Sequence, residues 1–144
     1  MIVKQILKLK ADGAVHTIAP DATLADAAQE LAARRIGVLI VSGDGQAVAG
    51  IVSERDIVRE LGRRGAVCLS DTVETIMTRS VVSCSPGDGA DDVLEKMSAG
   101  RFRHMPVIDE GKLVAMVSQG DVVKAKLAEL AMEKDALQGM IMGH

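Results

Sequence analysis

At the end of two aliphatic runs, the chain places a serine three residues before an aspartate. Ser53 precedes Asp56 in the first segment, and Ser118 precedes Asp121 in the second. Each segment follows a run of β-branched and aliphatic residues typical of a strand and opens a stretch typical of a helix. An ionised aspartate at such a junction can accept hydrogen bonds from two vicinal hydroxyl groups, which a ribose presents. The sequence therefore indicates a candidate sugar-binding carboxylate in each segment.

The same spacing also has a purely structural interpretation. A serine at a helix N-cap and an acidic residue three positions later nearly form a capping box, which satisfies free amides of the first turn. Two features favour a ligand site. The segment occurs twice, and each copy lies where a strand's carboxyl end meets a helix N-terminus, a place where ligands and anions tend to bind. Both interpretations stay open.

A bound anion beside these carboxylates needs cations, and the two copies supply them differently. Arg55 lies within the first segment, whereas Gly120 takes the equivalent place in the second. The second copy instead carries Arg101, Arg103 and His104 just before its central strand. Each arginine alone is typical of a solvated loop. Together with the histidine and the nearby helix N-terminus, the two arginines favour phosphate binding.

The base of a nucleotide would need an aliphatic slot, because the chain has no Trp or Tyr and a single Phe. Backbone amides and carbonyls would then recognise an adenine along the two central strands. The residues concerned are Gly37, Val38 and Leu39 in the first copy, and His104, Met105 and Pro106 in the second. Pro106 lacks an N–H group, which leaves a nearby carbonyl without its usual partner in a sheet.

An internal repeat positions these segments. Pro20 and Pro86 are each followed by apolar residues at the i, i+3, i+4, i+7 spacing of one helix face. Two copies of one supersecondary unit, each burying its apolar face against the other, predict an α/β (α+β) fold with pseudo-two-fold symmetry. Each copy is expected to run strand, helix, strand, strand, helix.

The elements expected in each copy follow from hydrophobic periodicity and turn residues. In the first copy they are strands over 15–18, 38–41 and 47–52, a helix capped by Thr23 and Asp26 that runs through Leu31, and a helix from Ser53 to about Gly62. In the second they are strands over 81–83, 105–108 and 113–117, a turn over 109–112, and helices over about 89–97 and from Ser118.

The repeat divides the chain into a first copy at residues 1–66, a second copy at 67–126 and a C-terminal helix at 127–144. Apolar residues in this helix alternate in steps of four and three, interrupted by Lys134. They are Leu127, Leu130, Leu137 and Ile141. Such a seam predicts packing against a partner, such as a second copy of the chain in a homodimer, or against the helix's own domain. Both stay open.

The composition argues against several classes of function. The formal net charge of −3 gives no basic field, which argues against nucleic acid as a partner. No apolar run approaches the roughly 20 residues that a membrane span needs, and the N-terminus is not typical of a signal peptide. Cys68 and Cys84 form no CxxC motif, so we expect two reduced thiols in a cytoplasmic protein.

Catalysis and metal binding find little support in the sequence. The candidate bases, nucleophiles and ligands are His16, His104, His144, Cys68 and Cys84, and no two of them lie at a catalytic or metal-ligand spacing. We therefore expect no enzyme, no metal site and no required cofactor. A structural dimerisation module without a small-molecule ligand is the strongest alternative, since capping explains both aspartates. The basic cluster at 101–104, which capping does not require, is the feature against it.

Taken in order, these motifs resemble tandem cystathionine-β-synthase (CBS) domains, the pair often called a Bateman module, of the stand-alone bacterial type. The resemblance rests on residues 15–20, 50–56, 101–107 and 114–121, with 76–78 opening the second copy. It extends over almost the whole chain apart from the C-terminal helix. The order and duplication of these motifs are more specific than any one of them alone.

The resemblance implies a non-catalytic regulatory module that binds an adenosine-containing ligand, such as AMP, ATP or NAD(H), in clefts between the two repeats. Such modules usually dimerise and act in signal transduction as energy or redox sensors on a target that the sequence does not name. In this family Asp56 and Asp121 would hold ribose, Ser53 and Ser118 would assist, and Arg103 and His104 would meet phosphate. Because Gly120 departs from the family's usual basic residue, we expect two clefts that are not equivalent.

Overall fold

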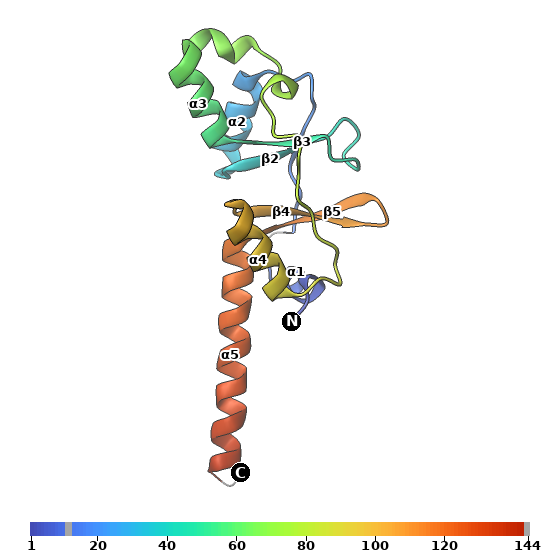
Figure 1. Cartoon of the computed structure of the whole chain (residues 1–144), viewed down its shortest axis with the longest axis vertical. Coiled ribbons are helices and arrows are strands. Elements are labelled where there is room, and N and C mark those ends of the chain that lie inside the picture. The colour runs from blue at the N-terminus through green and yellow to red at the C-terminus, as the bar shows by residue number, and fades with distance from the viewer. Residues whose placement is uncertain (11–12, 143–144) are drawn as a thin grey trace. The chain divides into compact units, whose positions relative to one another are not determined.

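The computed structural model describes residues 1–10 and 13–142, which form two compact units (Figure 1). Each unit is assembled from segments that are separate in the sequence. The first unit contains residues 14–82 and 109–114, and the second contains residues 1–13, 83–108 and 115–144. The boundaries expected at residues 66 and 126 concern the sequence repeat, and they stay a prediction.

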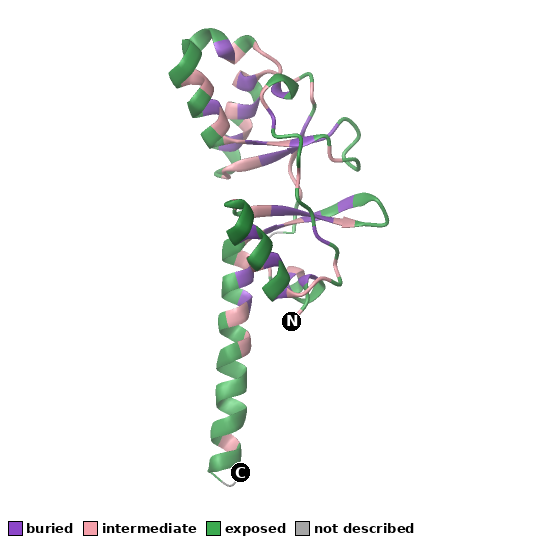
Figure 2. Ribbon diagram, in the orientation of Figure 1, coloured by how far each residue is buried: buried purple, intermediate pink, exposed green. Residues whose placement is uncertain are grey.

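The first unit packs two helices against a three-stranded sheet with the strand order β1-β2-β3. Its elements are β1 (Thr17–Ile18), α2 (Leu24–Arg34), β2 (Val38–Val41), β3 (Gly50–Ser53), α3 (Glu54–Arg64) and the short 3-10 helices η1 (Gly65–Ser70) and η2 (Val73–Thr75). β1 and β2 are parallel, whereas β2 and β3 are antiparallel with Val38 opposite Ser53. This register places the start of α3 beside the first residue of β2. Leu24, Leu39 and Val52 are fully buried in the aliphatic core (Figure 2).

The second unit joins an N-terminal helix to the elements of the second repeat. Its elements are α1 (Val3–Leu9), α4 (Ala90–Gly100), β4 (His104–Asp109), β5 (Lys112–Ser118) and α5 (Gln119–Ile141). Residues 109–114, the turn with the adjoining ends of β4 and β5, are grouped with the first unit. β4 and β5 form a two-stranded sheet, and Met105 and Val107 are fully buried. The predicted turn at 109–112 is confirmed, with Glu110 and Gly111 at φ values of 50° and 78°.

The segments that open the two sequence copies make equivalent contacts in the two units. In the second unit the amide of Lys4 donates to the carbonyl of Pro86 at 2.8 Å. In the first unit the amide of Glu74 donates to the carbonyl of Pro20 at 3.1 Å. The segment that begins the chain therefore packs with the second repeat, and it brings Lys10 into the second unit.

Three predicted strands differ in the structure, and the one predicted over 15–18 forms only at Thr17–Ile18. The strand predicted over 81–83 is wrong: Val82 is exposed, and only the next residue, Cys84, forms a bridge, which pairs with Val107. The strand predicted from residue 47 begins only at Gly50. Asp44 explains the delay, because its Oδ1 accepts from the amides of Gln46 and Ala47, both at 2.8 Å, and turns the backbone there.

The predicted C-terminal helix is the continuation of the helix that follows Ser118. α5 runs without interruption from Gln119 to Ile141, and residues 143 and 144 of the predicted range lie outside the described chain. Only its first turns pack, with Val122 and Ala125 buried against the rest of the second unit. Its later turns are exposed (Figure 2). Among the described residues no helix has both the length and the apolar character needed to cross a bilayer.

Candidate functional site

The first Ser-x-x-Asp segment forms a complete capping box at the start of α3. Ser53 is the N-cap, and its Oγ accepts from the amide of Asp56 at 3.2 Å. In return Asp56 Oδ2 accepts from the amide and from the hydroxyl of Ser53, both at 2.9 Å. The other carboxylate oxygen, Oδ1, lies 3.4 Å from Nη1 of Arg59, a side chain that is 66% exposed. Capping therefore uses one oxygen of this aspartate, and the second meets a loosely held cation.

The second segment repeats the box at the start of α5 and adds a distant partner. Ser118 Oγ accepts from the amide of Asp121 at 3.0 Å, and Asp121 Oδ2 accepts from the amide of Ser118 at 2.8 Å. Lys10 Nζ lies 3.1 Å from the same Oδ2 and donates to the carbonyl of Met116 at 2.7 Å. Within the described residues no hydrogen bond reaches Oδ1 of Asp121. The cation at this box therefore comes from a distant part of the chain, whereas Arg59 at the first box comes from the same helix.

The electrostatic environment of the second segment follows from these contacts. Burial opposes ionisation of Asp121, but hydrogen bonds from Ser118 and from Lys10 outweigh it and hold the pKa of the carboxyl below its usual value. Burial lowers the pKa of His104; Asp121 counteracts this, while Lys10 and Arg103 lower it further. Asp121 is thus anionic and His104 neutral at neutral pH.

The residues expected to read a base in the first copy lie beside the first box. The carbonyl of Gly37 accepts from the amide of Glu54 at 2.9 Å, Val38 is paired with Ser53, and Leu39 is buried. Arg55 lies on the first turn of α3 and is exposed to solvent. The structure therefore gathers these four predicted residues around the start of α3 within one unit.

The second copy shows the same arrangement around the start of α5. The carbonyl of Arg103 accepts from the amide of Gln119 at 2.8 Å, which holds this segment against the second box. His104 is half-buried, whereas Met105 and Pro106 are buried in β4. Arg101 is the exposed C-cap of α4, with a φ of 56°. Arg103 and His104 lie near the aspartate, since both Asp121 and Arg103 act on His104.

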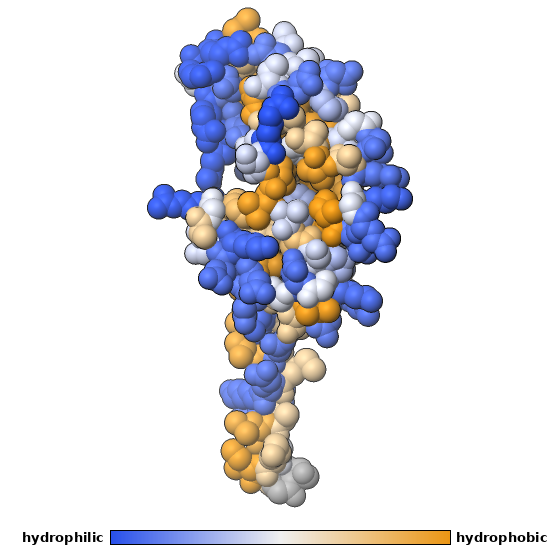
Figure 3. Space-filling model, turned by 45° about the vertical axis from the view of Figure 1, so that its right-hand side comes forward, coloured by the Kyte–Doolittle hydropathy of each residue, from blue (hydrophilic) through white to orange (hydrophobic). Residues whose placement is uncertain are grey.

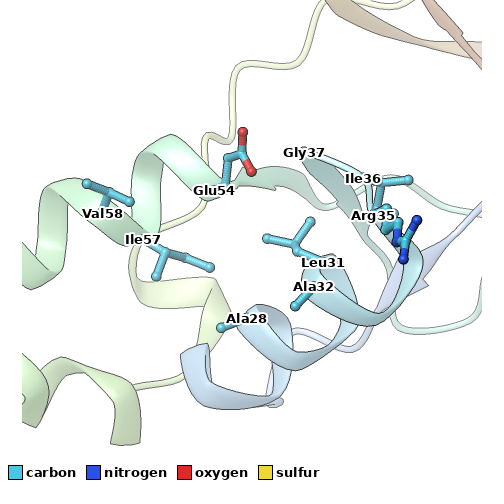
Figure 4. A pocket seen from close by; sticks show the side chains of 9 residues that line it. All are labelled: Ala28, Leu31, Ala32, Arg35, Ile36, Gly37, Glu54, Ile57 and Val58. Carbon is cyan, nitrogen blue, oxygen red and sulfur yellow. The ribbon is translucent and has the colours of Figure 1, made fainter.

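An open groove of about 500 Å³ lies between α2 and α3 in the first unit (Figure 4). Leu31, Ile36 and Ile57 give it an apolar floor, and Arg35 and Glu54 stand at its edge. Gly37 is the one predicted site residue among those that line it, and neither Ser53 nor Asp56 does. The groove is therefore a different surface from the capping box.

Sequence reasoning missed Lys10. The bond from this lysine to Met116 spans 106 residues of sequence, and no local pattern links them. A third capping box shows a second limit of the sequence: Thr23 and Asp26 exchange the same hydrogen bonds at the start of α2, each at 3.1 Å. Spacing alone therefore does not distinguish a cap from a site.

The residues weighed for catalysis and metal binding are scattered. Cys68 and Cys84 are buried and free, and burial raises the pKa of the Cys84 thiol to about 11. In the described part of the chain no three His, Cys, Asp or Glu side chains are grouped to hold a metal ion. His144 lies outside the described residues.

Comparison with known proteins identifies the family of this chain. The family model described as "CBS domain" matches residues 4–63 and 73–128. The crystal structure of the CBS-domain containing protein ATU1752 from Agrobacterium tumefaciens superposes with a TM-score of 0.82 at 40% identity, covering 88% of this chain and 99% of that one. The mitochondrial CBS domain-containing protein CBSX3 of Arabidopsis thaliana is 33% identical over 98% of this chain and 72% of its own length.

A similar structure was solved with bound ligands. The CBS domain pair of protein MJ0100, solved in complex with 5-methylthioadenosine and S-adenosyl-L-methionine, has a TM-score of 0.77 at 25% identity. The match covers 90% of this chain and 98% of that one. Both ligands named for that protein contain an adenosyl group.

Proposed function

This chain belongs to the CBS domain family, and on that premise we propose that it is a non-catalytic regulatory module that binds an adenine nucleotide. The ligand class is AMP, ATP or NAD(H), with the ribose held by Asp56 in the first unit and by Asp121 in the second. The module acts in the cytoplasm as an energy or redox sensor and passes ligand-dependent changes to a protein target. Both free thiols are consistent with a reducing compartment.

The observation that carries the proposal is the use of one oxygen per aspartate in the caps. In both boxes Oδ2 accepts the serine amide, so Oδ1 takes no part in capping. A carboxylate oxygen accepts more than one hydrogen bond, and bonds to a charged acceptor are stronger than neutral ones. A ribose diol can therefore bind without breaking either cap.

A structural module without a ligand remains the second candidate, because the boxes at Thr23, Ser53 and Ser118 are complete without one. The box of Thr23 and Asp26 has the same bonds but does not follow a central strand of the repeat. It provides a control with which the two candidates can be separated.

Titration calorimetry with AMP, ATP and NADH tests the proposal. Asp56→Ala and Asp121→Ala should each weaken binding at their own site by roughly 10- to 150-fold, because a hydrogen bond to a charged group contributes about 1.5–3 kcal/mol. Asp26→Ala removes a matching cap carboxylate and should leave the affinities unchanged. Equal affinities for all three variants and the parent would remove the ribose assignment.

Thermal unfolding provides an independent measurement. A ligand at 100 times its dissociation constant stabilises the folded state by about 2.7 kcal/mol, so the melting temperature should rise. If no adenine nucleotide raised it at millimolar concentration, the structural module would be the better description.

We also propose that the chain forms a homodimer and that the exposed part of α5 contributes to it. Leu127, Leu130, Leu137 and Ile141 are all exposed, and apolar side chains gather along this part of the helix (Figure 3). The helix docks on its own unit only as far as Glu129, whose carboxylate lies 3.4 Å from the N-terminal amine of Met1. Leu130→Glu with Leu137→Glu should lower the mass measured by light scattering if the apolar seam pairs with a second copy.

A further inference from the structure

Lys10 is the cation closest to the second aspartate. Its ammonium contacts Asp121 Oδ2 at 3.1 Å and the carbonyl of Met116 at 2.7 Å, and its side chain is 20% exposed. The lysine follows α1, whose helix is held to the second unit by the bonds from Val3 and Lys4 to Asp88 and Pro86. The backbone hydrogen bonds of α1 therefore position the main chain of Lys10. The Met116 carbonyl and Asp121 Oδ2 position its ammonium.

The groups around this ammonium carry more positive than negative charge. Lys10, Arg103 and Asp121 all act electrostatically on His104, so these four side chains form one cluster within the second unit. Asp121 neutralises one cation, and the exposed Arg103 leaves a second. An ammonium has three N–H donors, of which two are used, so Lys10 can take a further oxygen. This set of charges suits a ligand that combines hydroxyl donors with an anion.

We propose that Lys10 is a specificity-determining residue of the second site, which holds Asp121 while no ligand is bound and turns to the phosphate of a bound nucleotide. The inference rests on the proposed function, since it presupposes that Asp121 receives a ribose. The 2′ and 3′ hydroxyls replace Lys10 as donors to the carboxylate, and the phosphate replaces the carboxylate as the partner of Lys10. The bond from Lys10 to the Met116 carbonyl stays in place throughout.

The consequence is selection for phosphorylated ligands. A diol that bonds to both carboxylate oxygens displaces Lys10 from Oδ2, and a nucleoside without phosphate offers the ammonium no new anion. A nucleoside monophosphate restores an ion pair for each one it breaks. A lysine that only supports the fold predicts no such difference, because its loss would affect both ligands equally.

Calorimetry with adenosine and AMP separates these possibilities. The measurements use the full chain with Asp56→Ala, so that binding at the first site is weakened and the second site dominates the titration. Lys10→Met should weaken AMP binding by about 10-fold or more, the loss expected for one charge-assisted hydrogen bond. Adenosine affinity should stay equal or rise, because Asp121 is released from its ion pair. Lys10→Arg should keep the preference for AMP, and Lys8→Met, an exposed lysine on the same helix, should change neither affinity.

The outcomes distinguish a failure of the proposed function from a failure of the proposed role of Lys10. If the Asp56→Ala chain binds neither ligand while the unmodified chain also binds none, the proposed function fails and Lys10 with it. If AMP binds but Lys10→Met keeps the ratio of AMP to adenosine affinity, the proposed function stands and the role of Lys10 is wrong. Should Lys10→Met fail to fold, Lys10→Gln, which keeps a donor for Met116 but not the charge, decides by the same ratio.

Discussion

The two Ser-x-x-Asp boxes share their capping hydrogen bonds and differ in the cation that meets each aspartate. Both follow a strand, both cap a helix, and both use Oδ2 of the aspartate. Arg59, the cation near Asp56, comes from the same helix and is largely exposed, whereas Lys10, near Asp121, comes from the start of the chain. A repeat therefore copies its backbone hydrogen bonds faithfully, while the charge at each copy depends on a segment outside the motif.

The helices that follow the boxes also differ. α3 ends at Arg64, where Gly65 adopts a φ of 74°, but α5 has no such stop and continues to Ile141. Glycine ends helices because it adopts positive φ without a steric penalty. The last helix of the first repeat therefore ends after about three turns, whereas the last helix of the second repeat continues as a long helix with an exposed apolar seam.

The largest change in the free energy of unfolding is expected at Gly50, a glycine that the second repeat replaces with Ala115. A Cβ at Gly50 would lie 2.8 Å from the carbonyl oxygen of Thr78, with which the neighbouring Ile51 exchanges two backbone hydrogen bonds. The structure around it would have to shift, so Gly50→Ala should lower the free energy of unfolding by about 1–3 kcal/mol. Urea denaturation measures this.

The matched position in the second repeat is Ala115, which already carries a Cβ and is buried. Ala115→Gly should cost only about 0.5–1 kcal/mol, the usual cost of glycine in a regular element. A Gly50→Ala chain as stable as the parent would contradict the close approach between β3 and Thr78.

Local sequence was sufficient for the elements that position the sites. The capping residues Thr23, Ser53 and Ser118 were each predicted at the N-cap where the structure has them. Periodicity and capping act over a few residues, so one sequence contains their signal. The central strands, at 38–41 and around 105–108, follow for the same reason.

The rest depended on contacts that no short window contains. The strand predicted over 81–83 has residue types typical of a strand, but these residues pair with no neighbouring strand. Only Cys84 forms a bridge with β4. Arg101 lies two residues before Arg103, and its place as the C-cap of α4 was not predicted from the sequence. Lys10 could not be found at all, because its place depends on α1 packing with the second repeat.

An intermediate free-energy effect is expected from the ion pairs of the two boxes, Lys10 with Asp121 and Arg59 with Asp56. A double-mutant cycle on Lys10→Met and Asp121→Ala should give a coupling energy of about 1 kcal/mol, because both side chains are largely buried and hydrogen-bonded. The same cycle on Arg59→Met and Asp56→Ala should give less than about 0.5 kcal/mol, because that pair is long and solvent-exposed on one side. Equal coupling energies in the two cycles would remove the asymmetry between the boxes.

The smallest effect concerns the pH dependence of stability near neutrality that His104 gives the second unit. Burial lowers the pKa of His104 below 6.5, the nearby cations Lys10 and Arg103 lower it further, and Asp121 partly compensates. As the pH falls below 6.5 the unfolded chain binds a proton at this histidine before the folded chain does. Stability should therefore decrease towards the folded-state pKa and be unaffected by this group above pH 6.5.

His104→Val tests this by giving the second copy the residue that Val38 supplies in the first. Urea unfolding at pH 7.5 and at pH 5.5 should give a smaller difference in free energy for the variant than for the parent. The result also bears on the ligand, because an anion bound beside His104 favours its protonated form and raises its pKa. AMP binding should then take up protons near pH 6, which calorimetry detects by repeating the titration in buffers of different ionisation enthalpy. Proton uptake that persists in His104→Val would assign it to another group and leave the second site without its titrating residue.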